Sequence, residues 1–270
     1  MPLPILQNVT DPTPENLVRL YHRAVLHFVR HLGDEAALEA GTAFTNAAMP
    51  EVDDANCLLD AGVAEGSAVA EVMAEVDAHF AAAGVACRAV VPNPAAPPAR
   101  TEGLIRHLLD SGWRRHAADI YHFAGTPRAA PGAARGVTVI PARASFRHAR
   151  QLAEEAAAEA GRPQLADAIL AHLDDPHWDA LLALRDGCAV ATVGVLAVGE
   201  LGAIDELFVS APARRLGLGS LMMGRALEIC ARSLFRHVML SVPPGNIAAA
   251  SLYTRLGFRP IGQVVSFRRA

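Results

Sequence analysis

The spacing of apolar residues predicts an α/β fold in the second half of the chain. Residues 136–141 alternate as a strand does, and residues 145–160 and 164–173 have helical spacing on either side of a break at 161–163. Two strands then hinge at Asp186-Gly187, which is a hairpin signal. The remaining elements are strand 203–209, helix 220–234, strand 237–242, helix 247–256 and strand 262–268. This order predicts a mixed, mostly antiparallel sheet flanked by helices.

The first half repeats the last part of this order. Its elements are helix 68–83, strand 87–91, helix 104–110 and strand 118–123, with Gly112-Trp113 in the place of Gly257-Phe258. Such self-similarity predicts two copies of one α/β unit. The alternative is an unrelated α/β domain in which the order of elements coincides by chance.

A linker is predicted between the two halves. The stretch from Thr126 to Gly136 consists mostly of small residues, prolines and glycines. A chain of 270 residues also exceeds one typical domain of ~100–200 residues. We therefore expect a first domain at residues 1–126, a linker at 127–135 and a second domain at 136–270.

Composition narrows the choice of partners and location. Hydrophobic residues make up 52% of the chain and charged residues 19%, which is typical of a folded globular protein. The net charge of -4 argues against a nucleic-acid binder, which needs a basic surface. The most apolar run, 188–198, is too short for the ~20 residues of a membrane span, and the first residues have no signal-peptide pattern. The four cysteines form no C-x-x-C pair. We expect a cytoplasmic protein with no membrane or nucleic-acid partner.

The run Arg214-Arg215-Leu216-Gly217-Leu218-Gly219 lies between a predicted strand and a predicted helix. At such a turn the unpaired N–H groups and the dipole of the helix N-terminus favour an anion. Glycines at 217 and 219 permit a tight turn and a close approach by phosphate. The loop predicts a binding site for a phosphate-bearing cofactor.

A second motif follows the strand at 237–242. It reads Asn246, Ala249, Leu252, Tyr253, Gly257 and Phe258, a pattern N-x-x-A-x-x-L-Y-x-x-x-G-F. Together with the loop, it makes residues 136–270 resemble the GNAT superfamily of acyl-CoA N-acyltransferases. The sequence departs from many relatives at Arg215, where the first glycine of the family loop often lies, and at Pro212, which is displaced by one position. Neither departure removes Gly217 or Gly219.

The resemblance implies acetyl-CoA, or another acyl-CoA, as co-substrate. Its pyrophosphate is expected on residues 214–220, which end at Ser220, with Arg214 or Arg215 adding charge-assisted contacts. In the family, two strands splay apart beside the pantetheine arm. Here those strands are 203–209 and 237–242, and backbone groups of Leu207, Phe208 and Val209 are expected to pair with the arm. Asn246 either binds this arm or caps the following helix.

The resemblance also implies catalytic roles. Tyr253 is expected to be the general acid that protonates the departing thiolate, the alternative being a core aromatic. Asp205 matches an acid that acts in some relatives directly or through water. Asp205 and Glu206 are adjacent on a strand, so we expect them to face opposite sides of the sheet. The alternative is that neither acid is a base and the amine loses its proton to water.

The first half has no cofactor loop before its helix. It has Asp60 to Ser67 instead, with an acid near the place of the phosphates, and Leu108 where the second half has Tyr253. We therefore expect tandem GNAT-like domains in which the first has lost its cofactor site, an arrangement similar to that of mycothiol synthase. One cofactor would then bind per chain.

The predicted function is an N-acetyltransferase that moves an acetyl group to a primary amine by direct attack. The acceptor is a small-molecule amine or a peptide N-terminus or side chain, and a homodimer is left open. The acids of 154–175 either attract a cationic amine or form a solvated helix face. The competing function is a non-catalytic acyl-CoA-binding or interaction module.

No metal is predicted. His27 and His31 lie at i, i+4 on a predicted helix, but the sequence shows no third or fourth ligand and no H-E-x-x-H frame.

Overall fold

The computed structural model describes residues 13–125 and 136–269. The predicted linker at 127–135 lies outside the described residues. The elements of the first half are α1 (Pro14–Val29), β1 (Asp34–Leu38), β2 (Gly41–Thr45), β3 (Cys57–Ala61), α2 (Val69–Ala82), β4 (Ala89–Pro92), α3 (Pro98–Asp110) and β5 (Arg114–Phe123). Those of the second half are β6 (Val137–Pro141), η1 (Ala142–Ala144), α4 (Phe146–Ala160), α5 (Leu165–Ala171), η2 (His172–Asp174), β7 (Trp178–Arg185), β8 (Cys188–Val198), β9 (Leu201–Val209), η3 (Ala211–Ala213), α6 (Leu218–Arg232), β10 (His237–Val242), α7 (Ile247–Leu256) and β11 (Phe258–Arg268).

Local chemistry explains where these elements end. Gly161 and Gly257 take the left-handed conformation at the C-termini of α4 and α7. Asp186 and Gly187, with φ of 50° and 78°, turn β7 into β8 as the hairpin signal predicts. The largest differences from the expected bounds are α3, which begins at Pro98 because proline suits a first helical turn, and the longer strands β5 and β11.

All strands belong to one sheet of 11, in the order β1-β2-β3-β4-β11-β5-β10-β9-β8-β7-β6. Two pairings, β3 with β4 and β9 with β10, are parallel, and the others are antiparallel. The predicted fold class, a mixed and mostly antiparallel α/β sheet, is confirmed. Each parallel pair occupies the corresponding place in its own half.

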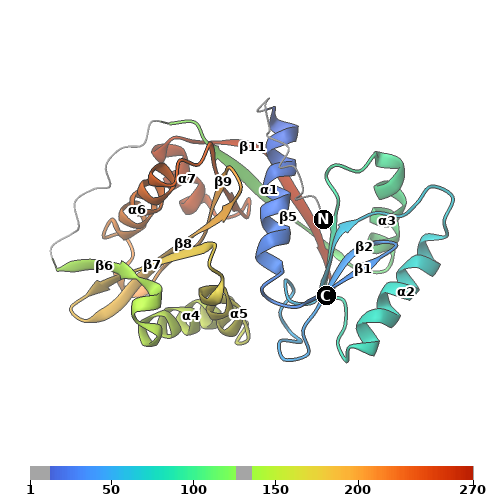
Figure 1. Ribbon diagram of the computed structural model, residues 1–270, viewed down its shortest axis with the longest axis horizontal. Helices are drawn as coiled ribbons and strands as arrows, with labels where there is room; N and C mark the ends of the chain where they lie inside the picture. Colours follow the sequence, from blue (N-terminus) through green and yellow to red (C-terminus); the bar gives the residue numbers. More distant parts are fainter. Residues whose placement is uncertain (1–12, 126–135, 270) are drawn as a thin grey trace, which may run out of the picture.

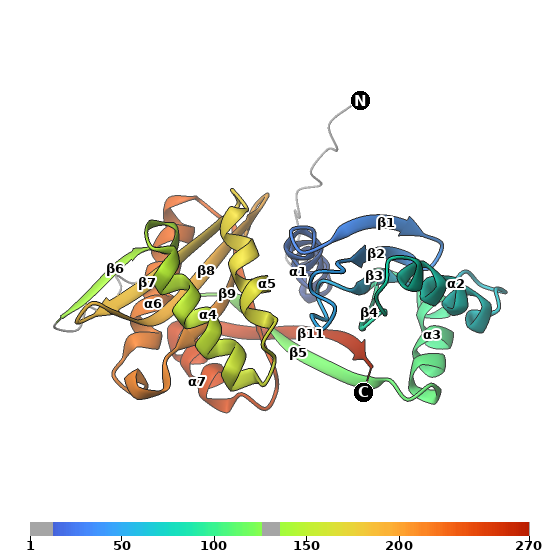
Figure 2. The same cartoon turned by 90° about the horizontal axis from the view of Figure 1, so that it is seen from below.

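The two halves exchange their last strands. β5, from the first half, pairs with β10, while β11, from the second half, pairs with β4. β5 and β11 also pair with each other from Phe123 and Phe258 to Arg114 and Arg268. Figure 2 shows this ribbon crossing from one half of the molecule to the other. Each half therefore completes the sheet of its neighbour.

Helices cover both faces of the second half. α6 packs on the face that presents Val193, Ile204 and Leu240. α4 and α5 pack on the opposite face over Leu182, and α1 covers that same face farther along, over Trp178 and Ala203. α1 thus stands between the two halves (Figure 1). Within the described residues, no helix is both long and apolar enough to cross a membrane.

Candidate active site

The second half contains a seam where two parallel strands separate. β9 and β10 pair at Leu201, Gly202 and Ala203, and no pairing between them follows. Beyond that point β10 continues along β5, and β9 continues along β8. The inner edge of Leu207, Phe208 and Val209 is therefore free of β10. Its backbone groups are available to a ligand in the gap, except the Val209 carbonyl, which accepts from Arg214 Nε.

A β-bulge lies at the point of separation. Asp205 pairs with Gly194 and Phe208 with Thr192, so two residues of β9 face one residue of β8. Glu206 has φ of 54°, and its N–H donates to Oδ1 of Asp205 at 2.7 Å. The expectation that Asp205 and Glu206 face opposite sides is wrong, because the bulge turns both side chains to the face covered by α1, α4 and α5.

Asp205 lines a cavity of about 130 Å³ beneath α1, together with Tyr21, Ser241 and Trp178. Its carboxylate is accessible to solvent, yet the surrounding walls of the cleft raise its pKa, as does the charge of Asp54. The Tyr21 hydroxyl is hydrogen-bonded to Ser241, and burial raises the Tyr21 pKa above its ordinary value. The first half thus contributes a wall of this cleft.

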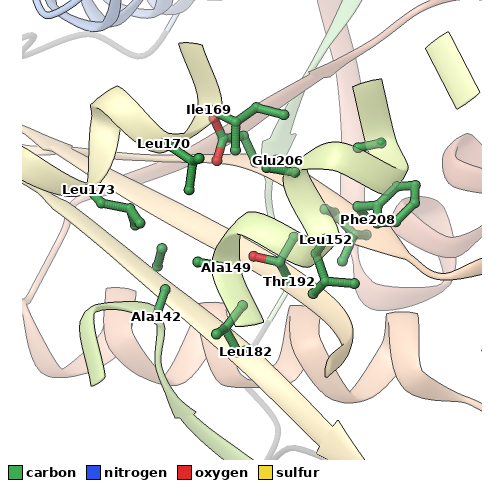
Figure 3. Close-up of a pocket in the computed structure, with 14 residues that line it drawn as sticks. Ala142, Ala149, Leu152, Ile169, Leu170, Leu173, Leu182, Thr192, Glu206 and Phe208 are labelled. Carbon is green, nitrogen blue, oxygen red and sulfur yellow. The ribbon is translucent and has the colours of Figure 1, made fainter. Parts of the chain in front are cut away.

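Glu206 faces a different, apolar pocket. This pocket of about 210 Å³ lies between α4, α5 and the sheet, and Thr192 and Glu206 are its polar lining residues. Figure 3 shows both among alanine, leucine and isoleucine side chains and Phe208. Burial raises the Glu206 pKa well above its usual range, and the Asp205 charge adds to the effect. Such a carboxyl group favours its neutral form.

Tyr253 lies on α7 next to the seam. Its ring is 7% exposed and packs against Tyr121 and Phe258, with ring centroids 6.4 and 6.0 Å away. Burial, and then the charge of Asp205, raises its pKa to about 12. Its hydroxyl has no hydrogen-bond partner in the described part of the chain. The structure therefore brings Tyr253 and Asp205 to one site.

The predicted phosphate loop has two left-handed residues. Gly217 has φ of 80° and begins α6, and Arg215 has φ of 65°. The second value explains why a glycine is common at this position in relatives. Gly219 lies in the first helical turn, where an added Cβ would be 3.3 Å from Leu252 of α7. Its small size thus also serves helix packing.

The N-terminus of α6 is open to an anion. No side chain caps this helix, so the N–H groups of its first turn, from Leu218 to Ser220, are available. The Leu218 side chain is buried, whereas Leu216 and Arg215 are exposed. Within the described residues no acid pairs with Arg215, which leaves its guanidinium available to phosphate.

Arg214 has a different role from the one expected. Its Nε donates to the Val209 carbonyl at 3.0 Å, and its guanidinium pairs with Glu159 of α4 at 2.5 Å. Ser210 donates to Glu155 at 2.6 Å. Glu155 and Glu159 of α4 therefore hold the start of the loop in place, a role that neither of the two alternatives for the acids of 154–175 predicted.

Asn246 caps α7. Its side-chain oxygen accepts a hydrogen bond from the Ala249 N–H at 3.1 Å. This is one of the two predicted roles, and the residue is exposed beside the end of β10. The cap fixes the first turn of the helix that carries Tyr253.

The corresponding seam of the first half is closed. β3 and β4 pair at Cys57 and Leu58, and after a bulge they pair again at Ala61 and Pro92. The bulge residue, Asp60, has φ of 56° like Glu206, and its carboxylate is 2.7 Å from His22 Nε2. The next N–H, of Val63, donates to the Arg100 carbonyl of α3 at 2.9 Å. This half keeps the bulge but has no open edge.

One further cavity lies between the Asp205 cleft and an arginine-rich pocket. A cavity of about 260 Å³ shares Asp54 and Ser241 with the cleft, and it shares His116 and Arg268 with a larger pocket of about 720 Å³. The larger pocket is lined by Arg88, Arg114, Arg162, Arg268 and Arg269. Three of these, Arg88, Arg162 and Arg268, lie 3.0–3.2 Å from Asp53.

Sequence reasoning missed this second end of the site. Tyr21, Asp54 and Arg114 belong to the first half, and only the strand exchange and the position of α1 bring them to the seam. Ser241 was within the predicted strand, but its residue type alone carries no signal. Nothing in the local pattern of these residues could have identified them.

Comparisons with known proteins agree with this geometry. Residues 143–258 match the model of the Acetyltransferase (GNAT) family. None of the curated proteins compared with the chain matches it. Among solved structures, a GCN5-related N-acetyltransferase from Kribbella flavida is 18% identical with a TM-score of 0.64, over 93% of this chain and 95% of that one.

Two further structures share the fold over most of the chain. A GCN5-related N-acetyltransferase from Sphaerobacter thermophilus is 21% identical with a TM-score of 0.55, over 74% of this chain and 67% of that one. A tandem GNAT protein from the clavulanic acid biosynthesis pathway is 17% identical with a TM-score of 0.54, over 73% and 68%. Residues 143–258 therefore carry the sequence pattern of the GNAT acetyltransferase family, and the fold of both halves is similar to that of these proteins.

Proposed function

We propose that the chain is an N-acetyltransferase that transfers an acetyl group from acetyl-CoA to a primary amine by direct attack, in its second half. One observation carries the proposal. The β9–β10 seam opens beside the uncapped N-terminus of α6, and Asp205 and Tyr253 both lie at that opening.

The residues present fit acetyl-CoA. Gly217 and the N–H groups of Leu218 to Ser220 would hold its pyrophosphate, with Arg215 as the charged contact. Leu207, Phe208 and Val209 offer a free strand edge to the pantetheine amides. A backbone N–H at the bulge is suited to polarise the thioester carbonyl. Acetyl-CoA supplies the acetyl group as a thioester.

Asp205 and Tyr253 would move the two protons of the reaction. Asp205 accepts the proton that the acceptor ammonium loses, and a raised pKa makes this carboxylate a better base than an ordinary aspartate. The amine nitrogen forms the new bond to the acyl carbon as the C–S bond breaks. Tyr253, which is protonated at neutral pH, gives a proton to the departing thiolate. The nitrogen loses its second proton as it becomes an amide, and this proton restores the Tyr253 hydroxyl.

Glu206 is the weaker choice of base. Its pocket is apolar and shares no lining residue with the cavity beneath α1 that Asp205 lines. Burial raises its pKa well above the usual range of a glutamate, which favours the neutral carboxyl group, and a neutral carboxyl group does not act as a base. Its contribution would be the bulge that turns Asp205 toward α1.

The cavities also suggest a chemical class of acceptor. At one end are Asp205 and Asp54, which favour an ammonium group. At the other end, the five arginines outnumber the three carboxylates that contact them, those of Glu51, Asp53 and Asp77, which leaves an excess of positive charge. Arg114 has no paired acid among the described residues. We propose a small-molecule amine that carries a carboxylate or phosphate at its far end.

The experiment combines binding and turnover. Thermal shift with acetyl-CoA measures binding, and release of the CoA thiol measures transfer to a panel of primary amines with and without a distal anionic group. We expect binding, and turnover that is fastest with the anionic amines. Binding without turnover on any amine would support the competing non-catalytic acyl-CoA module, and absence of binding would refute both.

A further inference from the structure

Two histidines of the first half and one aspartate of the second meet outside the acetyl-transfer cleft. His27 lies near the end of α1, His31 follows that helix by two residues, and Asp175 follows η2. One nitrogen of each histidine and one oxygen of Asp175 lie within 4.8 Å of one another. Asp175 has no exposed surface. The fold thus supplies the third group that the sequence pattern of His27 and His31 lacks.

Two of the three separations match those between ligands of one metal ion. Oδ2 of Asp175 is 3.4 Å from Nε2 of His27 and 3.2 Å from Nε2 of His31. Ligands at ~2.0–2.1 Å in a tetrahedral site lie about 3.3 Å apart. A single ion could therefore contact all three atoms without a large rearrangement.

Two of these atoms are buried without a hydrogen-bond partner among the described residues. Nε2 of His27 and Oδ2 of Asp175 are buried and have no hydrogen-bond partner in the described structure, although they lie close to each other. Buried polar atoms are almost always paired, and each exception needs an explanation such as an ion. Two imidazole nitrogens directed at one carboxylate oxygen are satisfied together by a cation.

The rest of the Asp175 residue is fixed. Its Oδ1 accepts the His177 N–H at 2.8 Å and lies 3.1 Å from His177 Nδ1. Arg143 donates to the carbonyl oxygens of Asp175 and of Leu173. Such outer contacts orient the carboxylates that bind metals. Oδ2 is thereby left facing the two histidines.

We propose that His27, His31 and Asp175 bind one zinc-class divalent metal ion. Two imidazoles and one carboxylate suit zinc, with a water in the fourth position. The ion would tie α1 to the segment that precedes β7. Because Tyr21 lies on the same helix, this link would fix the wall of the acceptor cleft without taking part in the reaction.

The test uses the full chain without an affinity tag. The protein is stripped with a chelator, loaded with zinc chloride, dialysed, and analysed for metal by mass spectrometry. We expect about one zinc per chain and a higher melting temperature after loading. His31→Ala, at a partly exposed side chain, and Asp175→Asn should weaken zinc binding by more than about 100-fold. His79→Ala, which removes a histidine from α2, is the matched control and should bind zinc normally.

Cobalt gives a second readout that does not depend on melting. Replacement of zinc by Co²⁺ should give the intense visible absorption of a tetrahedral site, and His31→Ala should abolish it. Substoichiometric zinc in the wild type, or zinc binding that is unchanged in His31→Ala, would overturn the proposal. Either result is independent of whether the chain transfers acetyl groups.

Discussion

The seams of the two halves begin alike and end differently. β3 and β9 each carry a left-handed acidic residue, Asp60 and Glu206, where the parallel pairing stops. After Asp60, β3 returns to β4 and the chain binds the first turn of α3. After Glu206, β9 and β10 do not pair again. The bulge alone therefore does not make a site, because the strands must also stay apart.

The fate of the acid follows from this difference. Asp60 is paired with His22 of α1, which lowers its pKa. Asp205, beside the corresponding Glu206, has no ion-pair partner among the described residues, and burial raises its pKa. The first half holds the Asp60 carboxylate in an ion pair, whereas the described part of the second half keeps the Asp205 carboxylate unpaired with a raised pKa. This contrast is testable residue by residue.

The largest expected effect is at Tyr253. Tyr253→Phe should lower kcat by about 10²- to 10⁴-fold with little change in acetyl-CoA affinity, because it removes a proton donor and keeps the ring. Tyr121→Phe, at the buried tyrosine beside it, is the control and should leave kcat unchanged. Steady-state kinetics measure both. An unaltered kcat in Tyr253→Phe would remove the assignment.

Next are the acids of the two seams. Asp205→Asn should lower kcat by about 10²-fold or more, and Glu206→Gln much less. Asp60→Asn should leave kcat intact but cost about 1–3 kcal/mol of unfolding free energy, measured in urea, because His22 loses a charged partner. Equal and small effects at Asp205 and Glu206 would instead mean that the amine loses its proton to water.

The pH profile sharpens the same contrast. Asp205 must be ionised to act, and its pKa is raised, so kcat/KM should rise with pH through a value above that of an ordinary aspartate. The titratable groups coupled to it are Asp54, Glu206, Tyr21 and Tyr253. With the same acceptor, Asp205→Asn should lack this rise in kcat/KM. The amine titrates in the same way with either enzyme, so its own titration does not explain the difference. A rise that persists would identify another base.

At Asp60 the pKa is shifted in the opposite direction from that of Asp205, and the shift should appear in the pH dependence of stability. Its pKa is lowered in the folded state, so its contribution is present at neutral pH and is lost as the pH falls through that lowered value. In Asp60→Asn this part of the acid destabilisation should be missing, as seen in urea midpoints measured across pH. A profile that matches the wild type would show that the His22 pair contributes nothing.

The arginine-rich end should affect the acceptor alone. Arg114→Ala should raise the acceptor KM by about 10-fold, the loss of one charge-assisted contact, and leave the acetyl-CoA KM unchanged. Arg115→Ala, at the neighbouring exposed arginine that does not line the pocket, is the control. A KM increase that also occurs with amines lacking a distal anion would refute the proposed acceptor class.

The smallest effects concern the loops. Arg215→Gly should stabilise the protein by up to about 1 kcal/mol by relieving a left-handed φ, and should raise the acetyl-CoA KM several-fold. Gly66→Ala, at φ of 88° in the first half, should cost about 1 kcal/mol with no change in either KM. If Arg215→Gly leaves the acetyl-CoA KM unchanged, Arg215 is not a phosphate contact.

The sequence predicted the parts of the fold that depend on local pattern. Apolar spacing placed β10 and α7 at their observed bounds, and the glycines at 161, 187 and 257 marked real turns. The sheet class and the GNAT match of residues 143–258 were also predicted. The sides of the sheet that Asp205 and Glu206 face were predicted wrongly. Side chains alternate between the two faces only in a regularly paired strand, and the bulge interrupts that pairing.

The rest depends on contacts between distant segments. The exchange of β5 and β11 leaves each strand with the same alternation that it would have in its own half, so no local pattern reveals it. The same is true of α1, whose Tyr21 reads as an ordinary core position, and of Asp175, which meets His27 only in three dimensions.

The strand exchange also constrains how the protein folds during synthesis. The edge of β4 that faces β11 stays unpaired until β11 has been synthesised, since Ala89 pairs there with Arg268, near the end of the described chain. Until then the first half has an open strand edge, which is a template for pairing with other chains. Because such long-range pairing is slow, newly made chains should depend on chaperones more than their size suggests. Acetyl transfer would begin only when the last strand is in place.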